Sequence, residues 1–114
     1  MFANDRQVSL VCMTLLERAG MHGWWAEDGP TGKAFSQERA RISDGECVML
    51  DVALGIWNSH EHTQARLVDI AYVLDDNNLE AVGSLLVAMS RGSFDDINLW
   101  LEQHPRPERK GSKG

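Results

Sequence analysis

The chain has 114 residues, 43% hydrophobic and 25% charged, a composition typical of one globular domain that needs no disulfides to form a core. The formal net charge of −6 disfavours nonspecific contact with nucleic acid phosphates. No apolar run reaches the roughly 18 residues of a membrane span, and Asp5 and Arg6 interrupt any signal peptide, so we expect a cytoplasmic protein with no membrane partner.

Charge is unevenly distributed along the chain. Residues 1–104 carry seven basic and sixteen acidic side chains, whereas residues 105–114 carry four basic and one acidic and nothing hydrophobic. This contrast predicts a helical domain over residues 1–104, followed by a disordered basic tail over 105–114. Cys12 and Cys47 lie far apart in apolar runs, which indicates free buried thiols in a reducing compartment.

The first predicted helix runs from Asp5 to Ala19, with Asn4 as its N-cap and Gly20 as its stop. Its helical wheel places one set of residues toward the core: Val8, Val11, Cys12, Leu15, Leu16 and Ala19. The outward set is Ser9, Thr14, Glu17 and Arg18.

A glycine- and proline-bearing stretch follows over residues 21–36. The turn signal Asp28-Gly29 predicts a hairpin that pairs the Trp24-Trp25 segment with residues 33–35, and a short helical turn is expected over residues 37–41. Neighbours on an extended chain point to opposite sides. We therefore expect one tryptophan to be anchored in the core and the other to lie at the surface or in a contact.

The second long helix is predicted over Asp44–Asn58, because Ser43 and Glu46 match a capping box. It is the most apolar helix, and only a narrow strip of its wheel is polar or small: Asp44, Cys47, Asp51, Gly55 and Asn58. Asp51 is either a functional carboxylate or one partner of a structural ion pair with Arg39, Arg41 or Arg66. The structural interpretation is favoured.

Three further helices complete the chain. The first is predicted from Ser59 to Leu74, with Leu67, Ile70, Ala71 and Leu74 facing inward. The next is predicted from Asn78 to Arg91, capped by Asn77 and Glu80, with a core face of Leu79, Val82, Leu85, Leu86 and Met89. The last begins at Ser93, carries the stripe Phe94, Ile97, Trp100 and Leu101, and stops at Pro105. The fold class is therefore all-α, a single bundle or orthogonal array of about five helices with an irregular or hairpin-like insertion at residues 21–36.

Three motifs suggest a chemical function, but each lacks residues or charges that the function requires. The GPTGK segment lacks the phosphate-loop pattern, because Glu27 stands where the first glycine is required and Ala34 where a hydroxyl is required. His60 and His62 alternate without the spacing of a zinc helix, which favours a solvated helix start. The helical pair around Asp75 and Asp76 is too acidic to read DNA. We therefore expect no cofactor, no metal and no catalytic residues.

The leftover apolar residues indicate either a protein-binding function or, as an alternative of nearly equal weight, that Trp24 and Trp25 cap the open end of the bundle and the other residues are scattered. Residues off the core faces, together with the tryptophan pair, form the candidate partner-binding set: Trp24, Trp25, Leu10, Met13, Val87 and Leu99. The sequence thus predicts a regulator, inhibitor or adaptor that buries an apolar-aromatic patch on another protein, with acidic residues at the rim selecting a basic partner. Self-association as a homodimer is also expected.

Two alternatives remain. The first is an acidic mimic of nucleic acid, which requires a row of carboxylates at phosphate-like spacing: Asp44, Asp51, Asp69, Asp75, Asp76, Asp95 and Asp96. The second, weaker one is a small metal-binding domain or enzyme that uses His60, His62 and Asp51.

Overall fold

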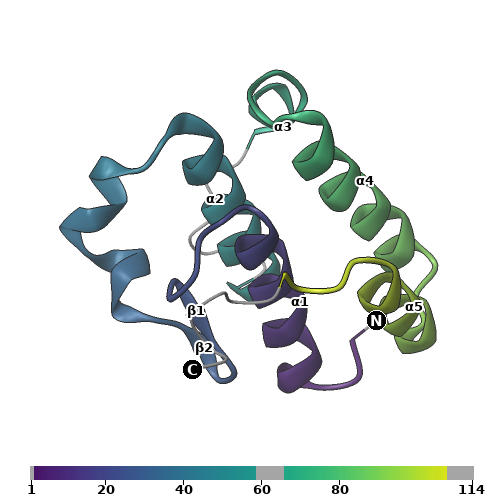
Figure 1. Cartoon of the computed structure of the whole chain (residues 1–114). Coiled ribbons are helices and arrows are strands. Elements are labelled where there is room, and N and C mark those ends of the chain that lie inside the picture. Colours follow the sequence, from purple (N-terminus) through teal and green to yellow (C-terminus); the bar gives the residue numbers. More distant parts are fainter. Residues whose placement is uncertain (1, 59–65, 108–114) are drawn as a thin grey trace.

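A computed structural model describes residues 2–58 and 66–107, and within these ranges the chain forms five α-helices and one two-stranded sheet (Figure 1). The elements in chain order are α1 (Asp5–Arg18), β1 (Trp25–Ala26), β2 (Gly29–Pro30), the 3-10 helices η1 (Gly32–Phe35) and η2 (Gln37–Arg41), α2 (Asp44–Asn58), α3 (Leu67–Val73), α4 (Asp76–Ser90) and α5 (Phe94–Gln103). The predicted all-α fold is confirmed.

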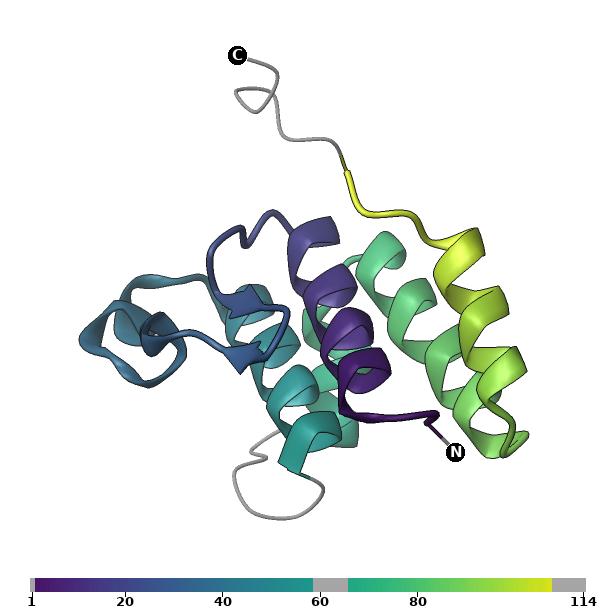
Figure 2. The same ribbon diagram turned by 90° about the horizontal axis from the view of Figure 1, so that it is seen from below.

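Helix α1 occupies the centre of the molecule, with α2 and the hairpin on one side and α4 and α5 on the other (Figures 1 and 2). The Asn4 side chain accepts a hydrogen bond from the Gln7 amide at 2.9 Å, which confirms the predicted N-cap. Residues 11–17 are all buried. The prediction of an outward face with Ser9, Thr14 and Glu17 is therefore wrong, because a central helix is covered from several sides.

Helix α2 has the predicted bounds and the predicted capping box. Glu46 Oε1 accepts from the Ser43 amide at 2.9 Å, and Ser43 Oγ accepts from the Glu46 amide at 3.2 Å. The helix packs against α1, and where they meet the Cys12 thiol donates to the Ala53 carbonyl at 3.3 Å. This α1–α2 pair forms the main part of the core.

The hairpin exists, but it is tighter than predicted. Trp25 pairs with Pro30 and Ala26 with Gly29, so the return strand comes directly after a Glu27-Asp28 turn. Residues 33–35, predicted as the return strand, belong to η1 instead. A loop of two residues closes the hairpin locally, which leaves the following segment to form the two 3-10 turns.

Ser9 holds the hairpin onto α1. Its hydroxyl donates to the Ala26 carbonyl at 2.7 Å and accepts from the Trp25 indole N–H at 3.0 Å, and the Ser9 residue is fully buried. The position is polar because it must satisfy two buried backbone and side-chain groups at once.

We expect Ser9→Ala to lower the free energy of unfolding by about 2 kcal/mol, because it leaves a buried donor and a buried acceptor unpaired. Urea denaturation followed by tryptophan fluorescence measures this change. Ser90→Ala is the matched control: its hydroxyl bonds the Val87 carbonyl at 2.7 Å on an exposed helix end. A control loss as large as that of Ser9→Ala would contradict the role of Ser9.

The three C-terminal helices differ from expectation in burial more than in position. The predicted start of the third helix, including His60, Glu61 and His62, lies outside the described residues, and α3 is described from Leu67. Leu67 and Ala71 were expected to face inward, but both are exposed, whereas Leu74 is buried as predicted.

Helix α4 begins two residues earlier than predicted. Asp75, in place of Asn77, accepts from the Asn78 amide at 2.8 Å and caps the helix. Leu86, expected in the core, is 46% exposed, because α5 and α1 cover other sides of this helix.

Helix α5 is capped by Ser93, whose hydroxyl accepts from the Asp95 amide at 3.0 Å, in line with the predicted start. Ile97 and Trp100 are buried as expected, but Phe94 is exposed.

Candidate functional site

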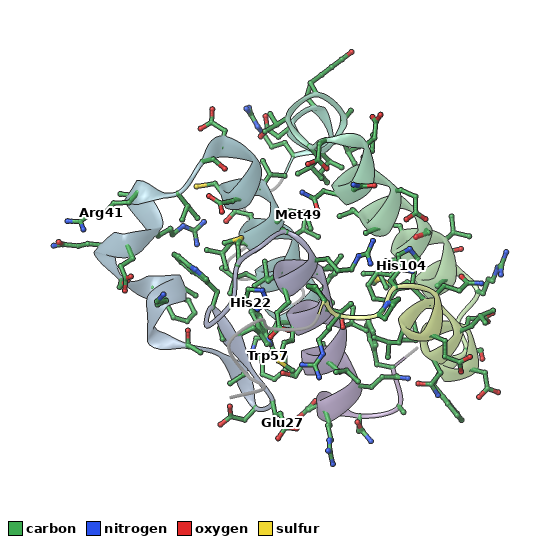
Figure 3. The ribbon with its side chains drawn as sticks, in the orientation of Figure 1. His22, Glu27, Arg41, Met49, Trp57 and His104 are labelled. Atoms are coloured by element: carbon green, nitrogen blue, oxygen red, sulfur yellow. The ribbon has the colours of Figure 1, made fainter. Side chains whose placement is uncertain are left out.

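Trp24 and Trp25 are both buried, so the expected surface patch around them does not exist. The Trp25 ring meets the Trp57 ring edge to face, with centroids 5.8 Å apart (Figure 3 labels Trp57). The Trp24 ring lies beneath the Lys33 amine, which is 5.6 Å from its centroid. Trp25 is covered by α1 and α2 through Ser9 and Trp57, whereas Trp24 is covered by η1 through Lys33.

The other predicted partner-binding residues are divided between core and surface. Met13 is buried and Leu10 is half-buried, which removes α1 from the candidate surface. Val87 and Leu99 are 52% and 46% exposed, as their positions off the core stripes predicted. They line one cavity of about 230 Å³ between α4 and α5, which also reaches Trp100.

The predicted acidic surface loses Asp51, which is buried and bonded to the Arg39 guanidinium. This is one of the structural pairs that the sequence left open. Asp44, Asp75 and Asp76 lie in the first turn or cap of α2 and α4, whereas Asp95 and Asp96 lie in the first turn of α5. Because α5 starts near the far end of α4, the acidic first turn of α5 lies apart from the acidic starts of α2 and α4 (Figure 1).

Helix α3 carries the two most exposed large hydrophobic side chains among the described residues. Four of its seven residues are large hydrophobics exposed by 81%, 55%, 84% and 39%, and they are Leu67, Val68, Tyr72 and Val73 in that order. We call this set the α3 face. None of the residues of α3 is buried, although the neighbouring Leu74 anchors its end in the core.

Sequence reasoning missed the α3 face, although a signal for it was present. Val68 and Tyr72 are four residues apart and so share a side of the helix, which adjoins the side that carries Leu67 and Ala71. A helix with apolar residues on more than one side is either buried or offers one side to a partner. We interpreted one side as the core and left the second unexplained.

Three elements meet at the C-terminal end of α3. The Val73 carbonyl oxygen lies 3.9 Å from the position that a Cβ on Gly45 would take, so α3 ends against the first turn of α2. Helix α4 starts directly after Leu74. Arg66, before α3, pairs with Asp69 at 3.1 Å.

A second polar cluster joins α4 and α5 around His104, which is buried at the end of α5 (Figure 3). Its Nδ1 lies 2.9 Å from the Trp100 carbonyl oxygen and its Nε2 lies 2.9 Å from Glu80 Oε1. The two partners are oxygen atoms on opposite sides of the imidazole ring, one from α5 and one from α4. Ser84 Oγ is 3.4 Å from Nε2 but bonds the Glu80 carbonyl at 2.7 Å, as a helical serine commonly does. The cluster is therefore a latch between two helices.

The hydrogen bond from His104 lowers the pKa of the Glu80 carboxyl below its ordinary value of 4.5. A carboxyl whose folded pKa is lowered stabilises the fold above its unfolded pKa and loses that effect as pH falls through the folded pKa. We expect this contribution to be lost progressively as pH falls below 4.5 and to stay below about 1 kcal/mol, since the Glu80 side chain is 60% exposed. Urea denaturation at a series of acidic pH values measures this contribution. If the free energy of unfolding of Glu80→Gln falls with pH as steeply as that of the unchanged protein, the proposed latch is contradicted.

The other reactive groups are inert or scattered. Burial raises the pKa of both thiols, Cys12 and Cys47, so neither is poised as a thiolate nucleophile. No group of three or more His, Cys, Asp or Glu in the described ranges is placed to hold a metal ion. His60 and His62 of the metal alternative lie outside those ranges.

A larger cavity of about 630 Å³ lies between α1, the hairpin and the segment after α5. Its lining mixes the carboxylates of Glu17 and Glu27 with the guanidinium of Arg106. The Arg106 guanidinium already lies 3.9 Å from Glu17 and 3.3 Å from the Met13 sulfur. The cavity is thus already occupied at its acidic wall by the guanidinium of Arg106 from the same chain.

Comparison with known proteins gives no match: no family model, no curated protein and no solved structure is significantly similar to the chain. Within residues 2–58 and 66–107, none of the helices combines the length and apolar character that crossing a bilayer requires. The function is therefore argued from the surface of this fold.

Proposed function

We propose that the protein acts by binding another protein, and that the α3 face is the surface it buries. The observation that carries this proposal is the exposure of Leu67 and Tyr72, by 81% and 84%, on a seven-residue helix of which one hydrophobic side chain, the half-buried Ile70, packs against the core. Single exposed hydrophobics are ordinary, but contiguous apolar patches on small domains mark interaction sites.

The chemistry of the α3 face suits an interface. Tyrosine is enriched among the residues that dominate binding energy, since it offers a large rigid ring and a hydroxyl. Val68 stands one turn before Tyr72, and the two form the contiguous apolar strip that a partner helix or strand covers. The role of regulator, inhibitor or adaptor predicted from the sequence thus moves from the tryptophan pair to this helix.

The test is site-specific photo-crosslinking in cells of the source organism. A photoreactive phenylalanine analogue in place of Tyr72 is expected to yield a discrete adduct of higher mass. The same analogue in place of Phe35, which is 60% exposed on η1, is the matched control for an exposed aromatic.

An adduct specific to position 72 supports the proposal, and its mass distinguishes a different protein from a second copy of the chain. The homodimer remains a prediction, and the mass of the adduct tests it. Identical adducts at both positions, or none at position 72, would show that the α3 face is not the binding surface.

A further inference from the structure

The α3 face is bordered by carboxylates that come from three separate elements. Asp44 and Glu46 stand in the first turn of α2, Asp69 is in α3 itself, and Asp75 and Asp76 stand at the start of α4. The contact of Val73 with the Gly45 turn and the direct passage from Leu74 into α4 bring these helix starts to one end of α3. Figure 1 shows α3 next to the first turns of both helices.

Positive charge at this end is sparse among the described residues. Arg66 is paired with Asp69, and Arg39 is bonded to the buried Asp51. Arg41 lies on η2 and points away from the molecule at the edge opposite α4 (Figure 3). Five carboxylates therefore stand in or next to α3 with one described guanidinium, that of Arg66, beside the helix. The rim of the α3 face is acidic, and Asp44, Asp75 and Asp76 are exposed.

A second copy of the chain fits this surface poorly. In a two-fold symmetric dimer the same patch occupies both sides, so the two acidic rims would oppose each other. Like charges placed across an interface reduce affinity and exclude wrong partners. A partner of opposite charge gains from the same arrangement.

We infer, on the basis of the proposed function, that the α3 face binds a basic amphipathic segment of a different protein. Apolar side chains of that segment cover Leu67 and Tyr72, and its lysine or arginine side chains meet the carboxylates at Asp44, Asp75 and Asp76. The apolar contact supplies most of the affinity, and the charges supply selectivity and a faster association rate.

The test measures binding of two short helical peptides by fluorescence anisotropy. One peptide has leucines along one side and lysines elsewhere, and the other has glutamates in place of the lysines. We expect the lysine peptide to bind at least about tenfold more tightly, and this preference to shrink as ionic strength rises.

Three variants place the binding on the α3 face. Asp44→Asn/Asp76→Asn is expected to weaken the lysine peptide about tenfold. Asp5→Asn/Asp95→Asn is the matched control, with the same charge change in the first turns of α1 and α5, and we expect less than a twofold effect. Leu67→Ser/Tyr72→Ser is expected to abolish binding of either peptide.

The outcomes separate this inference from the proposed function. If both peptides bind equally and both lose affinity in Leu67→Ser/Tyr72→Ser, the α3 face is a binding surface but the basic partner is refuted. If the lysine peptide binds regardless of every α3 variant, its binding is nonspecific attraction to an acidic protein, and the inference fails. A dimer in sedimentation that Leu67→Ser/Tyr72→Ser dissociates would assign the face to a second copy instead.

Discussion

Gly29→Ala is expected to lower the free energy of unfolding by about 3 kcal/mol, because the added Cβ incurs both backbone strain and a steric clash. Gly29 has a φ of +133°, a conformation that residues with a Cβ rarely adopt. A Cβ added there would also lie 2.9 Å from Cζ2 of Trp57. The Trp57 ring is held edge to face against Trp25, so it has little room to withdraw. Urea denaturation followed by circular dichroism measures the loss.

Two other glycines separate the two costs. Gly20→Ala introduces a side chain at a φ of +85° with nothing within 4 Å, so it reports the backbone cost alone. Gly32→Ala has neither an unusual φ nor a close neighbour, and we expect almost no change. In a Trp57→Leu background the Gly29→Ala cost should fall, because the contact with the Trp57 ring is removed and only the backbone cost of φ +133° remains. An undiminished cost there would show that the contact with Trp57 is not the cause.

The parts of the fold that sequence predicted well depend on contacts within a few residues. Helix α2 begins where Ser43 and Glu46 exchange hydrogen bonds, and Asn4 caps α1 through the Gln7 amide three residues later. Such signals are complete in the local sequence, because both partners are present before any tertiary contact forms. The helix positions followed from them.

Burial could not be predicted in the same way, because it depends on which elements cover a helix. The wheel placed Ser9 outside on account of its polarity, yet the hairpin folds over it and uses its hydroxyl. Trp24 and Trp25 have their covers in α1, α2 and η1, and nothing in their own neighbourhood of the sequence indicates this. A polar residue on a helix is thus weak evidence that its position is exposed to solvent when an insertion later in the chain can fold over it.

The same limit explains why the candidate site moved. The spacing of Leu67, Ile70, Ala71 and Leu74 predicts a core stripe. Leu74 is buried and Ile70 is half-buried against the core, whereas Leu67 and Ala71 are exposed. An apolar stripe has the same spacing whether it meets the core or awaits a partner. The two cases differ in how much of the helix its neighbours cover, and this is known only from the tertiary structure.

Arg39→Ala is expected to lower the free energy of unfolding by about 3 kcal/mol, because it leaves the Asp51 carboxylate buried without its cation. The Asp51 side chain is 12% exposed and that of Arg39 is 30% exposed, so the pair is largely removed from water. The pair also links η2 to α2, where the Cys47 thiol contacts the Arg39 carbonyl at 3.8 Å. Chemical denaturation at neutral pH measures the loss.

The double variant Arg39→Met/Asp51→Leu decides what the ion pair contributes. A buried pair often adds little net stability over apolar residues of similar volume, since both charges must leave water. We therefore expect the double variant to recover most of the stability that Arg39→Ala loses. Arg41→Ala, on the same 3-10 helix but exposed, is the control and should change stability by less than about 0.5 kcal/mol. If the double variant is as unstable as Arg39→Ala, the hydrogen bond itself holds η2 in place, and the loss cannot be attributed to an unpaired charge.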